Sequence, residues 1–298
     1  MTKRAPRRFA PLKNTPGQQH AHLPKLQGVI FDVDGTLCLP QNYMFTQMRS
    51  VLNIPKSIDI LTHISSLPTA PERETAMESI RAIEREAMSS QVAQPGLGTL
   101  MTYLQERSVR KAICTRNFEQ PVTHLLSKFL AGVDFAPIVT RDFSPPKPDP
   151  AGLLFIARSW GLVRDVPPSK RETGPETASL LDAAERGTAA EQAGARGPKE
   201  AERERGAETD NTNANANANA NIAEEEVGDA SALIMVGDSI DDMTAGRHAG
   251  AATVLLVNSE NAHLAEHPHT DLVIGSLDEL VGVLEAGFVG REIPVPSG

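Results

Sequence analysis

Short apolar runs alternate with helix-like stretches along most of this 298-residue chain, and this alternation constrains the fold more than any other feature. Each run is only a few residues long and ends at polar or turn-forming residues, as strands of a buried sheet do. The predicted strands span 26–31, 109–114, 137–140, 232–236, 253–257 and 271–274. The predicted helices between them span 118–130, 150–160 and a stretch ending near Ala249. Strands that alternate with helices predict an α/β fold with a doubly wound parallel sheet.

A long detour separates the first predicted strand from the second. Residues 41–94 hold helical patterns, and the clearest one spans 74–89, where apolar residues recur at helical spacing. Pro95-Gly96 closes the detour. We therefore predict a small helical cap over 41–94, inserted after the first strand. Such a cap would lie over the carboxyl ends of the strands, where open α/β sheets bind ligands.

Two segments lack the composition of a packed core. Residues 165–230 contain no Phe, Tyr or Trp, carry 15 acids and seven bases for a net charge of −8, and include an Asn-Ala repeat. We predict a disordered acidic low-complexity insertion there, because too few apolar side chains are present to offset the entropy of ordering. Residues 1–25 are predicted to form a disordered basic arm, since 1–31 hold six Lys or Arg and no acid. The predicted core is then 26–40, 95–164 and 231–290.

The composition excludes several classes of protein. At 40% hydrophobic residues the chain can bury a core, which rules out collagen-like and fully disordered proteins. Two cysteines do not make a disulfide framework and fit a reducing, cytoplasmic or nuclear location. No apolar run approaches the roughly 18 residues that a membrane helix needs, so no membrane is expected as a partner. The basic arm could touch nucleic acid or direct organelle import, but we interpret it as a solvated tail, so no nucleic acid is expected either. The oligomeric state stays open.

The strongest chemical motif is Phe31-Asp32-Val33-Asp34-Gly35-Thr36. Asp32 and Asp34 stand at the end of the first predicted strand, before a glycine that allows a sharp turn. One carboxylate can attack a phosphorus atom while the other handles a proton. An Asp-Gly turn that merely closes a strand is the alternative interpretation of this motif.

A second acidic motif, Gly237-Asp238-Ser239-Ile240-Asp241-Asp242, follows the fourth predicted strand. Carboxylates on neighbouring loops suit Mg²⁺, which binds a few oxygen ligands together with phosphate oxygens. Helix capping would explain Asp238 or Ser239 alone. It does not explain two acidic strand ends in one parallel sheet.

Two further positions are candidates for anion binding. Thr115-Arg116-Asn117 follows the second strand, where a hydroxyl and backbone N–H groups can hold an anion, although Thr is also a common helix cap. Lys147 lies in a proline-stiffened loop, and its ammonium can offset carboxylate and phosphate charge.

These four motifs, in this order, resemble those of the haloacid dehalogenase (HAD) superfamily of phosphohydrolases, and the chain is similar to HAD-like hydrolases of fungi over about residues 26–164 and 231–285. The resemblance implies a HAD-like Rossmannoid core and a Mg²⁺-dependent phosphatase that acts on a small phosphorylated metabolite. Asp32 would be the nucleophile that forms an aspartyl-phosphate, and Asp34 the general acid and base. The remaining implied roles concern metal and phosphate. Asp32, the backbone carbonyl of Asp34 and Asp238 would hold Mg²⁺ with support from Asp242, while Thr115, the Arg116 backbone and Lys147 would bind phosphate.

Asp34 bears on the type of reaction that the resemblance implies. Hydrolytic dehalogenases of this superfamily lack an acid at that position, because a halide leaving group needs no proton. An Asp at position 34 therefore favours phosphoryl transfer. Two alternatives stay open: a phosphomutase of the same fold, and a non-catalytic scaffold that binds partners through its acidic insertion.

Overall fold

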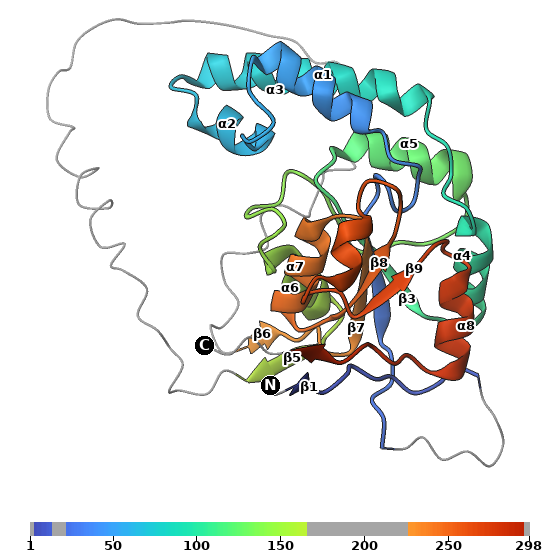
Figure 1. The fold of residues 1–298 in the computed structure, drawn as a ribbon. Helices are drawn as coiled ribbons and strands as arrows, with labels where there is room; N and C mark the ends of the chain where they lie inside the picture. Colours follow the sequence, from blue (N-terminus) through green and yellow to red (C-terminus); the bar gives the residue numbers. More distant parts are fainter. Residues whose placement is uncertain (1–2, 14–21, 166–225, 295–298) are drawn as a thin grey trace, which may run out of the picture. The chain divides into compact units, whose positions relative to one another are not determined.

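A six-stranded parallel sheet forms the centre of the protein (Figure 1). The computed structural model describes residues 3–13, 22–165 and 226–294. The strand order is β4-β3-β2-β7-β8-β9, and every pairing in it is parallel. The strands are β2 (Gly28–Phe31), β3 (Arg110–Cys114), β4 (Ile138–Val139), β7 (Leu233–Gly237), β8 (Ala252–Leu256) and β9 (Leu272–Ile274). The predicted doubly wound α/β sheet is confirmed.

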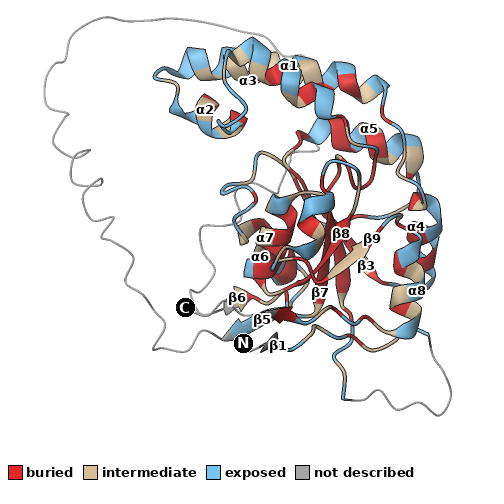
Figure 2. Ribbon diagram, viewed as in Figure 1, coloured by how far each residue is buried: buried red, intermediate tan, exposed pale blue. Residues whose placement is uncertain are grey.

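Helices cover both faces of this sheet. They are α4 (Leu97–Glu106), α5 (Glu119–Phe129), α6 (Ala151–Ser159), α7 (Ile240–Ala249) and α8 (Glu279–Ala286), with a short 3₁₀ helix, η3, at Ala262–Glu266. Successive strand residues point to opposite faces, so Val29 and Phe31 pack with α4, α5 and α8, while Ile30 packs with α6 and α7. Strands β2, β7 and β8 are buried along their whole length (Figure 2).

The strand order reverses direction at β2. The chain moves outward from β2 to β3 and β4 through helices on one face, and returns through α6 to β7 on the other side of β2. The carboxyl ends of β2, β3 and β7 are therefore left open at a topological switch point, where α/β sheets bind ligands.

Three helices lie between β2 and α4: α1 (Asn42–Leu52), α2 (Ile60–Ser66) and α3 (Ala70–Ser89). We call them the cap helices; they fall within the predicted 41–94 segment. Asp59 caps α2, and Thr69 with Glu72 forms a capping box at the start of α3. Their apolar faces bury a separate cluster: Met44, Met48, Ile60, Ile64, Ile80, Ala87 and, from the start of α5, Phe118.

The predicted insertion at 165–230 lies almost entirely outside the described residues. Its flanks are described: β5 (Val163–Asp165) and β6 (Glu226–Gly228) form a two-stranded sheet. Close by, the Asp229 N–H donates to the Leu162 carbonyl at 2.8 Å. The chain therefore leaves and re-enters the core at one place. This lets β4, which precedes the loop with Lys147, and β7 belong to the same sheet.

The N-terminal segment differs from our prediction. Residues 1–25 were predicted to be disordered, yet β1 (Lys3–Arg4) pairs antiparallel with β10 (Ile293–Pro294). Phe9 is only 2% exposed, and its ring centroid lies 5.7 Å from that of Phe288. The prediction was therefore wrong for residues 3–13, because one aromatic among basic residues is buried by a partner far along the sequence. No helix in the described ranges is both long and apolar enough to span a bilayer.

Candidate active site

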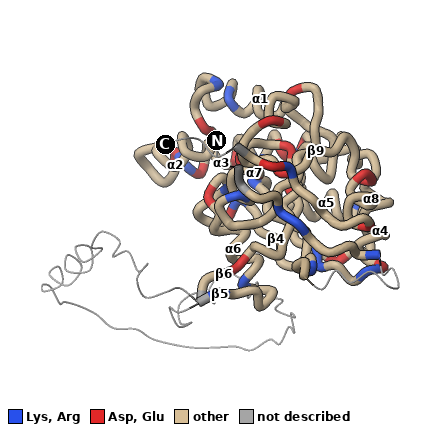
Figure 3. Tube along the Cα trace, turned by 60° about the horizontal axis from the view of Figure 1, so that its bottom comes forward, with Lys and Arg blue, Asp and Glu red and all other residues tan. Residues whose placement is uncertain are grey.

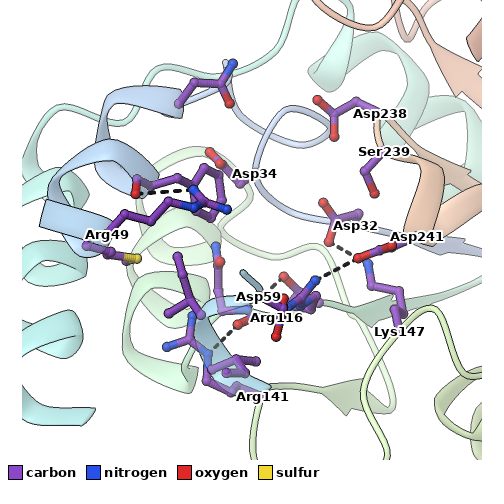
Figure 4. Close-up of a pocket in the computed structure, with 17 residues that line it drawn as sticks. Asp32, Asp34, Arg49, Asp59, Arg116, Arg141, Lys147, Asp238, Ser239 and Asp241 are labelled. Atoms are coloured by element: carbon purple, nitrogen blue, oxygen red, sulfur yellow. Dashed lines mark hydrogen bonds and ion pairs between the residues drawn. The ribbon is translucent and has the colours of Figure 1, made fainter. Parts of the chain in front are cut away.

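The predicted site residues meet where three neighbouring strands end. Asp32 follows β2, Thr115 follows β3, and Asp238 follows β7; β2 pairs with both of the other strands. Together with side chains from the cap helices, these residues line a cavity of about 230 Å³ (Figure 4). A parallel sheet explains this convergence, because all carboxyl ends lie at the same edge.

A buried ion-pair network joins three of the predicted residues. Lys147 is 5% exposed, and its Nζ lies 2.8 Å from Asp32 Oδ1 and 2.5 Å from Asp242 Oδ1. Burial alone would lower the pKa of Lys147, but the carboxylates of Asp242 and Asp32 raise it, so the ammonium stays charged. The loop between β4 and α6 thereby fixes a cation directly beside Asp32.

Asp242 has both carboxylate oxygens engaged. Its Oδ2 accepts from the Ser239 hydroxyl at 2.7 Å and from the Ser239 N–H at 3.0 Å, which completes a capping box at the start of α7. Its Oδ1 is held by Lys147. The side chain is fully buried, and in this geometry it contacts both Lys147 and Ser239.

Asp238 is held close to the turn after β2. Asn261 Nδ2 donates to the Asp238 carbonyl at 2.7 Å, and Asn258 Nδ2 lies 3.4 Å from Asp238 Oδ2. A Cβ on Gly35 would approach Asp238 Oδ2 to 2.1 Å, and Gly35 has a φ of +79°. Glycine is thus needed there both for the turn and for the close approach of two acidic loops.

The carboxylates fit a divalent cation. One oxygen from each of Asp32, Asp238 and Asp242 lies within 4.8 Å of the others. Burial, and then the charges of Asp242 and Asp32, raise the pKa of Asp238 to about 8. Burial also raises the pKa of Asp32 to about 6, although Lys147 opposes that shift. Hard oxygen donors with an excess of negative charge match the coordination chemistry of Mg²⁺.

Asp34 lies in the same cavity, on the side of the cap helices. Its Oδ1 accepts from the Gln41 N–H at 3.1 Å, just before α1 begins. Burial, with a further contribution from the charge of Asp32, raises the pKa of Asp34 to about 7.

Thr115 and Arg116 differ in what their side chains do. Thr115 is 4% exposed, and its Oγ1 accepts from the Asn117 N–H at 3.2 Å. The Arg116 guanidinium bridges two carboxylates, at 2.5 Å from Asp59 Oδ2 and 2.7 Å from Asp241 Oδ2. Acidic and basic segments are interspersed around α2, α3 and α7 (Figure 3). The Arg116 side chain therefore ties the cap helices to α7, and only its backbone is left for an anion.

Our sequence reasoning missed the charged residues on the far side of the cavity. Arg49, near the end of α1, and Arg141, just after β4, both line it. Arg141 pairs with Glu84 of α3, and both side chains are buried. The sequence offers one signal for Arg49: it lies four positions after Phe45, on a helix face that is otherwise apolar. That signal does not show which part of the protein the face contacts.

Comparisons with known proteins agree with this geometry. Residues 214–280 match a family model described as HAD-hydrolase-like. A Saccharomyces cerevisiae protein described as "Uncharacterized hydrolase YOR131C" is 35% identical over 266 residues, which cover 88% of this chain and 91% of that protein. The haloacid dehalogenase-like hydrolase domain-containing protein At2g33255 of Arabidopsis thaliana is 31% identical over 148 residues, or 46% of this chain and 59% of that protein.

Solved structures share the fold. A hydrolase from Pseudomonas syringae superimposes with a TM-score of 0.52 at 18% identity, covering 87% of this chain and 98% of that one. A protein described as a predicted phosphoglycolate phosphatase, from Haemophilus somnus, gives 0.51 at 14% identity, covering 87% and 97%. At these identities the likeness supports the fold alone. The matched family model, together with the yeast and Arabidopsis relatives, shows that the chain belongs to the haloacid dehalogenase (HAD) superfamily of hydrolases.

Proposed function

We propose that this hydrolase is a Mg²⁺-dependent phosphatase that cleaves a small phosphorylated metabolite through an aspartyl-phosphate on Asp32. One observation carries the proposal: a buried lysine holds Asp32 at 2.8 Å in a cavity that Asp34 and Asp238 also line. A nucleophile, a second carboxylate for proton transfer, and a fixed cation are the groups that phosphoryl transfer requires.

The metal would be held by the side chains of Asp32 and Asp238 and by the backbone carbonyl of Asp34. Bound there, Mg²⁺ would polarise the phosphoryl group and offset the repulsion between Asp32 and the phosphate. Lys147 adds a second positive charge beside Asp32, already in place before any substrate binds. Charges fixed in advance stabilise the transition state without reorganising.

In the first step, a carboxylate oxygen of Asp32 attacks phosphorus, and the bond from phosphorus to the ester oxygen breaks. Asp34 gives its proton to the departing alkoxide, so the alcohol leaves neutral. The Thr115 hydroxyl and the Arg116 N–H bind phosphoryl oxygens as they move. The product of this step is an acyl phosphate on Asp32.

In the second step, water attacks the phosphorus of the aspartyl-phosphate. Asp34, now ionised, takes a proton from that water, and the bond between phosphorus and the Asp32 oxygen breaks. Inorganic phosphate leaves and both carboxyl groups return to their starting states. The net reaction is phosphate ester plus water to alcohol plus phosphate.

An assay with an aryl phosphate tests the proposal. We expect turnover that requires Mg²⁺, stops with a chelator and is lost in Asp32→Asn. A reaction that needs a bisphosphate activator and releases no inorganic phosphate would instead indicate a phosphomutase. No turnover with Mg²⁺ for a panel of small phosphate esters would contradict the proposal.

A further inference from the structure

The half of the cavity away from Asp32 is lined by two guanidinium groups. Figure 4 shows Arg49 on the opposite side of the cavity from Asp32 and Asp238, with Arg141 at its lower edge. The mechanism above uses neither residue.

Arg49 has a buried donor without an acceptor. Its Nη1 donates to the Phe45 carbonyl of its own helix at 3.3 Å, while its Nε is buried and has no hydrogen-bond partner. Within the described ranges, Arg49 forms no ion pair. A buried donor that stays unsatisfied destabilises the protein, and more so when the group is charged.

Arg141 has a second such donor. Its side chain is 8% exposed, its Nε donates to the Arg116 carbonyl at 2.6 Å, and its Nη2 pairs with Glu84. Its Nη1 is buried and has no partner. The other two cations that line the cavity differ, because Lys147 and Arg116 are each held between two carboxylates.

We propose that Arg49, with Arg141, binds a second anionic group of the substrate, a carboxylate or a second phosphate, while Asp32 attacks the first phosphate. This inference rests on the proposed phosphatase function and names its substrate class. Planar guanidinium donors match such oxyanions, and both guanidinium groups line the same cavity.

The cavity also limits the size of this substrate. Its volume is about 230 Å³, below the roughly 300–1,000 Å³ typical of small-molecule pockets. The wall near Arg49 includes the apolar side chains of Phe45, Met48 and Ile60. A short carbon skeleton, with an acidic group at each end, fits these walls and charges.

A matched pair of phosphonates tests the second subsite without requiring turnover. 3-Phosphonopropionate carries a carboxylate where 3-hydroxypropylphosphonate carries a neutral CH₂OH, and neither can be hydrolysed. With Mg²⁺ and the full-length wild-type protein, titration calorimetry should give at least tenfold tighter binding of the carboxylate. Equal affinities would overturn the inference. Propane-1,3-diylbisphosphonate, in the same titration, distinguishes a phosphate-type from a carboxylate-type second group.

Arg49→Gln, compared with Arg85→Gln, assigns the effect to a residue. Both variants remove one arginine charge from the cap helices, but Arg85 is 41% exposed and pairs with Glu78. We expect Arg49→Gln to lower kcat/KM for phosphoglycolate about 10–100-fold, as loss of a charged hydrogen bond does. With 2-hydroxyethyl phosphate it should change kcat/KM less than threefold. Arg85→Gln should change neither value.

The outcomes separate this inference from the proposed function. If both esters are hydrolysed equally well, or if Arg49→Gln affects both equally, the second subsite is contradicted while the phosphatase stands. If no ester of a wider panel is hydrolysed either, the proposed function fails, and the phosphonate titration, repeated with Arg49→Gln, still decides whether Arg49 binds a second anion.

Discussion

The two halves of the cavity treat positive charge in opposite ways. On the sheet side, Lys147 is buried between Asp32 and Asp242, so its ammonium is paired with protein carboxylates before any ligand arrives. On the cap side, Arg49 and Arg141 keep buried N–H donors that nothing in the described chain accepts. The cations of the sheet side are therefore paired within the protein, whereas those of the cap side keep donors that our proposal assigns to a ligand.

This difference separates chemistry from recognition. The sheet side comes from the ends of β2, β3 and β7 and from the loop after β4, all fixed by one parallel sheet. The cap side comes mainly from helices that bury their own small apolar cluster. Substitutions on the sheet side should therefore affect every substrate, and substitutions on the cap side only those with a second charge.

The largest effect is expected from Asp32→Asn. The amide keeps the volume of the carboxyl group but is a far poorer nucleophile and metal ligand, so turnover should fall by more than about 10³-fold. The loss should be the same for phosphoglycolate and for 2-hydroxyethyl phosphate, unlike that of Arg49→Gln. Steady-state rates measured on protein free of deamidation check this. Activity within tenfold of wild type would remove Asp32 from the nucleophile role.

Lys147→Met should reveal the structural role of the sheet-side cation. Removing one partner of a buried ion pair costs about 3–5 kcal/mol, because charges stay buried and unpaired. That corresponds to a Tm lower by roughly 6–20 °C in a domain of this size. Arg49→Gln should change the Tm by less than about 2 °C. Melting curves of both variants test the contrast, and a Lys147→Met Tm equal to wild type would contradict it.

Mg²⁺ should stabilise the sheet side. A ligand at 100 times its Kd adds about 2.7 kcal/mol to the free energy of unfolding. The Tm should then rise by roughly 5–10 °C with Mg²⁺ and return when a chelator removes it. Asp238→Asn should lose most of this rise, and Arg49→Gln should keep it. A full rise in Asp238→Asn would place the cation elsewhere.

The smallest effect concerns the pH dependence of the metal-free protein. Because the pKa of Asp238 is raised to about 8 in the folded state from an ordinary 3.8, the folded protein holds a proton that the unfolded chain has released. The free energy of unfolding should therefore fall as pH rises between about 4 and 8. The chelator-treated protein should melt a few degrees lower at pH 8 than at pH 5.5. Asp238→Asn should reduce this slope but not abolish it, because the raised pKa values of Asp32 and Asp34 act in the same direction, and Arg49→Gln should leave it unchanged.

The sheet side could be predicted from sequence because its geometry is local to each strand end. An apolar run followed by Asp32, Thr115 or Asp238 places the side chain at the carboxyl end of a strand, and the parallel sheet brings those ends together. The sequence predicted that the Lys147 ammonium offsets negative charge. It did not predict that Asp32 and Asp242 pair with it, because they come from the end of β2 and from α7, far along the chain.

The cap side could not be predicted in the same way. Arg49 lines the cavity only because α1 is rotated to bury Met44 and Met48 against its neighbours. That rotation depends on packing among three helices, which one sequence does not specify. Likewise, Phe9 gave no sign of its burial, since Phe288 supplies the contact from the other end of the chain.

A direct test of the central claim uses the Asp34→Asn variant with an aryl phosphate. The aryl oxide leaves without a proton, so Asp32 should still be phosphorylated, whereas attack by water needs Asp34 as a base and should be slow. Rapid-mixing kinetics should show a burst of one phenol per enzyme, followed by slow turnover. Mass spectrometry of the quenched protein should place one phosphoryl group on the peptide with Asp32. Linear turnover with no burst, or a phosphoryl group on another residue, would contradict the account.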